Sequence, residues 1–236
     1  DVTIADMITG YGVARAVIDY YGRLDRSLDG AKMSLEGFGN VGAAAGLYLA
    51  YAPAVPNGRA GPDAPLEDRG VAILSTHPLE DVRVLELPRE RQRRVALVGT
   101  LRGTHRTGEP WSLRLASVHL ENRTGLDRLF DSFGAARTRQ ARFLAERLTD
   151  GPMVLGGDLN TWAPGFLEDA LDVLGPHYPQ TPPAEGATFR VAGIGRRLDH
   201  LLVRLPGASA VWAEVVAERY GSDHHPVVGV LTPPPA

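Results

Sequence analysis

Short apolar runs separated by turns and helical stretches constrain the fold of this chain more than any other feature. Each run is rich in Val, Ile and Leu and is bounded by Gly, Pro or charged residues, which is typical of strands. Many strands with fewer helices favour an α/β fold, in which two sheets face each other and helices lie outside. The expected strands are 71–75, 94–100, 113–120, 153–156, 198–203 and 227–231.

Two helices are expected between these strands. Residues 133–148 place apolar side chains near helical spacing, with arginines on the opposite face. A shorter helix is expected over 166–174, after the helix breaker Pro164-Gly165. The Pro- and Gly-rich stretches 56–68 and 175–186 read as loops, and loops of this length are often functional.

The first 47 residues fit the pattern less well. Residues 1–7 would form a strand and residues 13–21 a helix, while Gly42 and Gly46 weaken any helix near them. The chain opens at Asp1 without an initiator Met, so we expect a leader or a first strand to be missing. We interpret residues 1–236 as a single domain with an atypical N-terminal segment.

Composition excludes several classes of protein and site. The 236 residues contain no Cys, so disulfides and thiolate metal sites are ruled out and any metal must bind oxygen or imidazole. No stretch approaches the roughly 18–20 apolar residues of a membrane-spanning helix. The formal charge of −3 argues against a generally basic nucleic-acid binder. We expect a soluble monomer, and nothing indicates its compartment.

The segment Gly157-Asp158-Leu159-Asn160 follows the apolar run 153–155 and carries the strongest chemical signal. On an extended backbone alternate side chains share a side, so Asp158 and Asn160 can face one pocket. A carboxylate can orient or deprotonate a water, and a carboxamide can hold a phosphate oxygen. The alternative is a polar turn at the end of a strand, where Asp and Asn are common.

A second polar segment, Ser222-Asp223-His224-His225-Pro226, precedes the last apolar strand. Asp223 offers a hard oxygen ligand, and His224 offers an imidazole that titrates near neutral pH. An exposed turn with surface histidines is the alternative reading.

Two further residues stand out within strands. Asp199 interrupts the apolar run 198–203, which is costly unless the carboxylate has a partner, and His224 would suit. Otherwise Asp199 would face solvent on an edge strand. His119 closes the strand 113–120; alone, such a His is more often structural than catalytic.

The order of these segments along the chain is more informative than any one of them. It resembles the endonuclease/exonuclease/phosphatase family, a superfamily of metal-dependent phosphoesterases with a DNase I-like fold. The resemblance covers roughly residues 48–231 and implies a four-layer α/β/β/α sandwich. The matching motifs are His119-Leu120, Gly157-Asp158-Leu159-Asn160, Leu198-Asp199, Ser222-Asp223-His224-His225-Pro226 and the strand Gly70-Val71-Ala72-Ile73-Leu74-Ser75.

The resemblance implies in-line attack of water on a phosphomonoester or phosphodiester, with Mg²⁺ or Mn²⁺ as cofactor. By the family pattern, Asp158 orients or activates the water and Asn160 binds a phosphate oxygen. His119 donates to the phosphoryl oxygens. Positioning and charge neutralisation are what phosphoryl transfer mainly requires.

The same resemblance makes His224 the catalytic imidazole, paired with Asp199, and makes Asp223 a metal ligand. His200 and His225 match no settled family role, so we treat them as neighbours.

The chain departs from the family in its N-terminal part. The family's first strand carries an Asn, and its second strand ends in Leu-Gln-Glu, whose Glu is the principal metal ligand. Here Met7 would stand in place of that Glu, so we expect the first strand to be missing or degenerate. Glu36, after Ser34-Leu35, is a candidate substitute, as are Asp6 and Asp25.

Three functional hypotheses remain from the sequence. The first is a metal-dependent phosphoester hydrolase, and the second is a weak or inactive relative that binds a phosphate-bearing ligand or a partner. The third is a hydrolase of unrelated fold, although no Gly-x-Ser-x-Gly elbow is present. The substrate, whether nucleic acid, phosphoinositide or another phosphoester, is left open. The basic cluster Arg89, Arg91, Arg93 and Arg94 reads as a solvated surface.

Overall fold

The structure is a computed structural model that describes most of the chain after residue 47. The described residues are 48–56, 68–75, 77–90, 92–105, 107–122, 134–162, 169–183, 185–207, 210–219 and 222–232. Contacts divide the chain into two compact units, residues 1–49 with 74–78 and residues 50–73 with 79–236. The expected elements within residues 1–47 lie outside the described residues, and the single-domain organisation stays a prediction.

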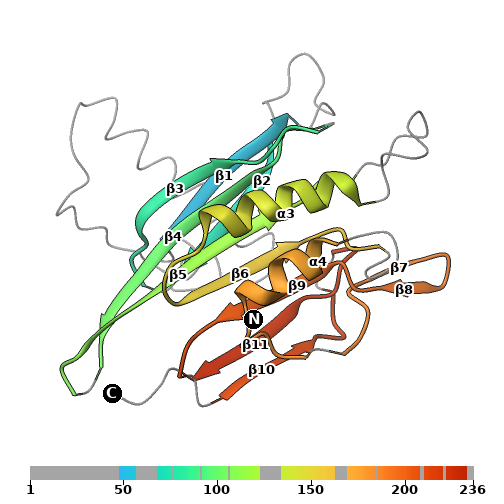
Figure 1. The fold of residues 1–236 in the computed structure, drawn as a ribbon. Helices are drawn as coiled ribbons and strands as arrows, with labels where there is room; N and C mark the ends of the chain where they lie inside the picture. Colours follow the sequence, from blue (N-terminus) through green and yellow to red (C-terminus); the bar gives the residue numbers. More distant parts are fainter. Residues whose placement is uncertain are drawn as a thin grey trace, which may run out of the picture. The chain divides into compact units, whose positions relative to one another are not determined.

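A five-stranded sheet is the centre of the larger unit (Figure 1). Its strands stand in the order β3 (Glu80–Glu86), β4 (Val95–Thr104), β5 (Pro110–His119), β6 (Met153–Asp158) and β9 (Asp199–Arg204). Only the β5–β6 pair in this sheet is parallel. Parallel neighbours need a crossover connection, and helix α3 (Ala135–Arg147) lies in the segment that joins them.

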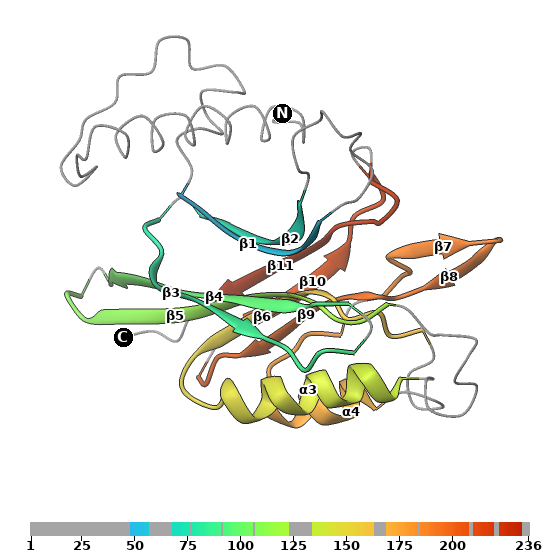
Figure 2. The ribbon, with the colours of Figure 1, turned by 90° about the horizontal axis from the view of Figure 1, so that it is seen from above.

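The remaining elements lie on the two faces of this sheet. Figure 2 shows α3 and α4 on one face and the pairs β1–β2 and β10–β11 on the other. Their bounds are β1 Tyr48–Pro56, β2 Asp68–Ser75, α4 Ala170–Leu174, the 3₁₀ turn Gly175–His177, β7 Phe189–Val191, β8 Ile194–Arg196, β10 Ala210–Val215 and β11 Val227–Thr232.

Strand β4 shows why this architecture suits the sequence. Ala96 and Val98 belong to the core beneath the helices, whereas Val95 and Leu97 belong to the core shared with β1 and β2. Both faces of β4 are therefore buried, which explains its continuous apolar run. The α/β sandwich is confirmed, with helices, central sheet and second strand layer in the larger unit. The helix expected over residues 13–21 lies outside the described residues.

The six expected strands and helix α3 are confirmed with small shifts at their ends. One local expectation is wrong: Asp199 does not interrupt a strand but begins β9, so its carboxylate lies at a sheet end. The sequence reading missed β1, β3, β7, β8 and β10. Among the described residues, no helix has the length and apolar character needed to cross a membrane.

Candidate active site

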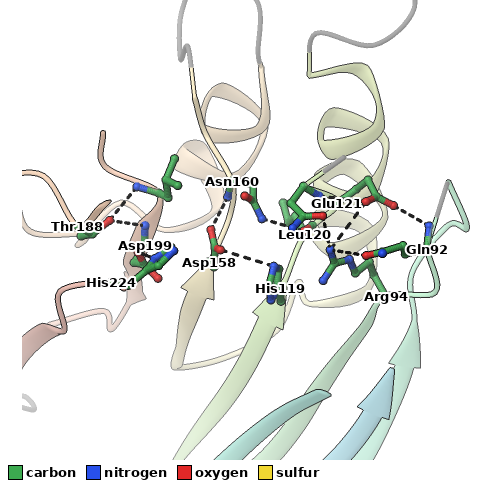
Figure 3. Close-up of polar contacts among 12 residues, drawn as sticks. Gln92, Arg94, His119, Leu120, Glu121, Asp158, Asn160, Thr188, Asp199 and His224 are labelled. Atoms are coloured by element: carbon green, nitrogen blue, oxygen red, sulfur yellow. Dashed lines mark hydrogen bonds and ion pairs between the residues drawn. The ribbon is translucent and has the colours of Figure 1, made fainter. Parts of the chain in front are cut away.

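Strand register brings three of the polar motifs to one end of the central sheet. His119 is the last residue of β5 and pairs with Asp158, the last residue of β6. Asp158 pairs in turn with Asp199, the first residue of β9. Figure 3 shows these three side chains next to one another, with His224 beside Asp199. Motifs spread over about 80 residues of sequence therefore meet at the ends of three adjacent strands.

His224 and Asp199 form a hydrogen-bonded pair. Nδ1 of His224 lies 2.7 Å from Oδ2 of Asp199, and both side chains are about one quarter exposed. Thr188 supports this geometry, because its buried hydroxyl accepts hydrogen bonds from the backbone N–H groups of Leu198 and Asp199. Phe189 forms a backbone bridge with His224, and their rings lie 4.8 Å apart. The imidazole is thus fixed from two sides.

The charges around His224 favour its protonated form. Burial alone would lower the pKa of His224, but the hydrogen bond to Asp199 and the charges of Asp199, Asp158 and Asp223 raise it above its ordinary value. A carboxylate on Nδ1 also directs Nε2 as the reactive nitrogen.

Asp158 is a carboxylate that is held away from water. Burial, assisted by the nearby charge of Asp199, raises the pKa of Asp158 to about 6, although the backbone N–H of Asn160 opposes this shift. That N–H donates to Oδ1 of Asp158 at 2.8 Å. A carboxylate that titrates close to neutral pH is suited to exchange protons with a water.

Asn160 is almost fully buried, at 3% exposure, and its backbone has a left-handed φ of 52°. Asn tolerates this conformation better than most residues. Its side-chain Nδ2 donates to the carbonyl of Leu120 at 3.1 Å, which ties the end of β6 to the end of β5. This contact gives Asn160 a positioning role, and its expected role as a phosphate ligand stays a prediction.

His119 stands on the other side of Asp158. Its Nε2 lies 3.5 Å from Oδ2 of Asp158 and has no hydrogen-bond partner among the described residues, although the atom is buried. Burial, together with the positive charge of Arg94, lowers the pKa of His119 to about 4. His119 is therefore neutral at physiological pH and offers a polar atom to a ligand at this place.

Arg94 was expected on a solvated surface, and that expectation is wrong. The residue is 6% exposed, and its Nη2 donates to Oδ1 of Asn122 and lies 3.8 Å from Oε1 of the buried Glu121. A buried arginine requires such partners because an isolated charge is costly to desolvate. This network lies immediately after His119-Leu120 and anchors the strand end (Figure 3).

Helix α3 holds the same strand end from the helical side. The buried Gln140 accepts from the backbone N–H of Glu121 at 2.9 Å and donates to the carbonyl of Pro88 at 3.1 Å. Arg137 donates to the carbonyl of Glu121 at 3.2 Å. The amphipathic pattern predicted the helix, but it gave no signal that these two polar residues face inward.

The structure brings together five of the predicted site residues, His119, Asp158, Asn160, Asp199 and His224. Asp223 lies exposed beside His224, and Glu36 lies outside the described residues. His200 and His225 make other contacts. A ring nitrogen of His200 lies close to the Thr161 hydroxyl, and one of His225 lies close to the Val216 carbonyl. Arg94, Gln140 and Thr188 support the site and were missed.

Comparison with known proteins agrees with this geometry. The model of the Endonuclease/Exonuclease/phosphatase family matches residues 19–224, so the chain belongs to this family. No curated protein matches the chain.

Solved structures share the fold at low sequence identity. An endonuclease/exonuclease/phosphatase from Beutenbergia cavernae aligns with a TM-score of 0.59 at 20% identity, covering 82% of this chain but only 56% of that protein. A functionally unknown conserved protein from Enterococcus faecalis aligns with a TM-score of 0.55 at 16% identity, covering 82% and 80% of the two chains. A family protein from Bacteroides thetaiotaomicron gives 0.51 at 16% identity, covering 80% and 77%.

The donor set at the site fits a hard divalent cation. One ligand atom each from Asp158, Asp199 and His224 can lie within 4.8 Å of one another. Mg²⁺ is usually bound through one or two carboxylates and keeps several waters, which matches two facing carboxylates. Burial is the main cause of the raised pKa of Asp158, and a cation bound beside this carboxylate would favour its ionised form. These residues therefore fit the metal that the family uses.

The lowered pKa of His200 predicts how the stability of the protein changes in acid. Burial lowers the pKa of His200 to about 4, so between pH 6.5 and 4 the unfolded chain binds a proton that the folded chain does not. Each such proton lowers the unfolding free energy by about 1.4 kcal/mol per pH unit as the pH falls. Asp158 acts in the opposite sense, since its folded pKa is raised from 3.8 to about 6.

Replacement of His200 by Gln is therefore expected to flatten the fall in stability across this window. Urea unfolding in EDTA at several pH values, compared with the wild type, measures the change in slope. Identical slopes for the two proteins would mean that the folded His200 titrates normally.

Proposed function

We propose that this protein hydrolyses a phosphoester bond by in-line attack of a water, with Mg²⁺ or Mn²⁺ as its cofactor. The observation that supports this best is the position of Asp158 at a sheet end, between neutral His119 and the hydrogen-bonded pair His224–Asp199. A base, a neutral polar group and a protonatable imidazole then surround one place where a phosphate can lie.

Asp158 is the group that positions the attacking water and accepts its proton at a carboxylate oxygen. Its pKa of about 6 keeps most of the carboxylate ionised at neutral pH, while leaving it basic enough to accept a proton. Because the N–H of Asn160 fixes Oδ1, the carboxylate keeps its orientation as the proton arrives.

His224 carries positive charge to the opposite side of the reacting phosphate. Asp199 holds Nδ1–H, so Nε2–H of the imidazolium can donate to an oxygen on which negative charge develops. His119, neutral because its pKa is about 4, donates or accepts through an imidazole nitrogen without adding charge.

Asp158 and Asp199 would hold the metal, with Asp223 at the exposed edge of the site. When bound, the metal supplies charge neutralisation for the phosphoryl oxygens. Strand pairing already places the two carboxylates next to each other, so binding the metal would cost little further conformational entropy.

Hydrolysis of bis-(p-nitrophenyl) phosphate and of p-nitrophenyl phosphate, measured in EDTA, Mg²⁺ and Mn²⁺, tests this proposal. We expect turnover that requires metal and disappears in the His224→Ala variant, and the ratio of the two rates indicates diester or monoester preference. Turnover that persists in EDTA, or in the variant, would contradict it. A folded protein inactive on all phosphoesters would favour the alternative of a relative that only binds a phosphate-bearing ligand.

A further inference from the structure

A pocket lies beside the reactive centre and takes no part in the proposed chemistry. It has a volume of about 460 Å³, and its lining includes Trp162, Leu171, Arg196 and Arg197. Thr161 and His200 form another part of the wall. An indole, an aliphatic side chain and two guanidinium groups thus share one concave surface.

No described residue forms a salt bridge with either of the two arginines. Within the described part of the chain, the buried Nε of Arg197 also has no hydrogen-bond partner. Among the described residues, the side chain of Arg196 donates to the carbonyl of its neighbour Gly195 and to no other group. A partly buried guanidinium group whose Nε–H lacks a partner, as in Arg197, is stabilised by an anion that reaches it.

The remaining wall of the pocket is held in place by contacts within the protein. The Thr161 hydroxyl lies 3.0 Å from the carbonyl of Arg197 and 2.8 Å from Nε2 of His200. These two contacts fix the position of the Arg197 backbone. Nε2 of His200 also lies 3.2 Å from the carbonyl of Arg197, so this ring atom has partners within the protein. Recognition in the pocket therefore rests on the two guanidinium groups.

A short chain of aromatic contacts joins the pocket to the reactive centre. The ring of Trp162 meets that of Phe189 edge to face at 5.6 Å, and Phe189 meets the imidazole of His224 at 4.8 Å. The pocket is thus two ring contacts from the catalytic imidazole. A substrate with its scissile phosphate near His224 can extend past Phe189 and place another group in the pocket.

We propose that this pocket binds a second, non-scissile phosphate group of the substrate. The assignment rests on the proposed function, since it names a further part of the same substrate. Guanidinium groups match phosphate in geometry and charge, and Trp162 and Leu171 can pack against the apolar part that links the two phosphates. A neighbouring phosphate of a nucleotide chain and a second phosphate on a polyol ring share this chemistry.

Binding of inorganic pyrophosphate in EDTA tests the pocket without any turnover. Titration calorimetry would compare the wild type with Arg196→Gln, with the double variant Arg196→Gln/Arg197→Gln, with His224→Ala, and with Arg83→Gln as a matched control. Arg83 is an exposed arginine on β3, at the far edge of the central sheet. We expect the double variant to weaken binding about tenfold or more and Arg196→Gln by a smaller factor, since charge-assisted contacts to phosphate are lost in both.

Arg83→Gln is expected to bind pyrophosphate within about twofold of the wild type, because Arg83 does not line the pocket, whereas His224→Ala reports any anion that is held at the reactive centre. Arg196→Gln keeps the test valid if the double variant does not fold, since Arg196 is exposed. Binding that is lost in His224→Ala but kept in both arginine variants would place the anion at the reactive centre and overturn the assignment.

Matched substrates then distinguish the two sources of phosphate. Thymidine 5′-(p-nitrophenyl phosphate) would be compared with its 3′-phosphorylated form, and an inositol monophosphate with an inositol bisphosphate. In one of the two substrate pairs, the member with the extra phosphate should have a kcat/KM about tenfold higher than the member without it. In the arginine variants, this ratio of kcat/KM values should fall towards one. If the substrates are hydrolysed but neither the kcat/KM ratio nor pyrophosphate binding depends on the two arginines, the assignment is overturned. Arginine-dependent binding without hydrolysis would instead refute the proposed function and leave the anion pocket standing.

Discussion

Replacing Asp158 by Asn is expected to lower the rate of phosphoester hydrolysis by a factor of about 10³, since general bases contribute roughly 10²–10⁴. The carboxamide keeps the shape of the carboxylate and can still accept from the N–H of Asn160, so the backbone at the end of β6 should be unchanged. What is lost is the ability to accept a proton and to hold a cation. Initial rates at saturating Mg²⁺ or Mn²⁺, with folding checked by circular dichroism, measure the effect.

The same variant is expected not to lose stability when no metal is present. The folded pKa of Asp158 is raised from 3.8 to about 6, so the ionised carboxylate disfavours the folded state and this cost develops as the pH rises through 6. Removing the charge should therefore raise the unfolding free energy at pH 7 in EDTA, by on the order of 2 kcal/mol. Loss of activity with retained or increased stability is characteristic of a group held for function.

Asp172→Asn provides the matched control, since this carboxylate is exposed on α4 and takes no part in the site. It should leave both the rate and the unfolding free energy nearly unchanged. An Asp158→Asn protein that keeps more than about a tenth of the wild-type rate would remove Asp158 as the base. A variant that loses rate and stability together would reduce Asp158 to a structural residue.

The chemistry-bearing residues of this site could be predicted because each occupies a strand end with its own local signal. Asp158 follows an apolar run and glycines, and His224 lies in a polar turn before an apolar strand. Their convergence follows from strand register, because a parallel pair and an antiparallel pair place His119, Asp158 and Asp199 at one end of the sheet. The position of Asp199 was misjudged by one residue at the strand boundary, which does not alter its partner.

The supporting residues could not be predicted, because their partners are distant in sequence and their own positions look ordinary. Arg94 stands in a run of charged residues, and nothing local shows that it is buried against Glu121, 27 positions later. Thr188 follows a Pro- and Gly-rich stretch, yet its hydroxyl fixes the start of β9. Strands β7 and β8 have three residues each, too few to show a period.

Gly157→Ala is expected to disrupt both the sheet and the site, because β6 has no room for a side chain at this position. Gly157 has a φ of +147°, a conformation that L residues rarely adopt. A Cβ there would lie 1.9 Å from the carbonyl oxygen of Val118, on the paired strand β5. The obstacle is backbone in a parallel ladder, so relief requires the two strands to separate where they carry His119 and Asp158.

We expect Gly157→Ala to lower the unfolding free energy by about 4 kcal/mol or more, as backbone strain and a main-chain clash act together. Gly156→Ala is the matched control, because its Cβ would meet Leu201 Cδ1 at 3.6 Å and the carbonyl oxygen of His200 at 4.0 Å, both ordinary contact distances. That variant should differ from the wild type by about 1 kcal/mol or less. Urea unfolding of both proteins measures the contrast, and equal stabilities would mean that β5 and β6 can part without cost. Where Gly157→Ala still folds, its hydrolysis should fall further than that of Gly156→Ala, because the glycine that lets the strands approach also sets the His119–Asp158 spacing.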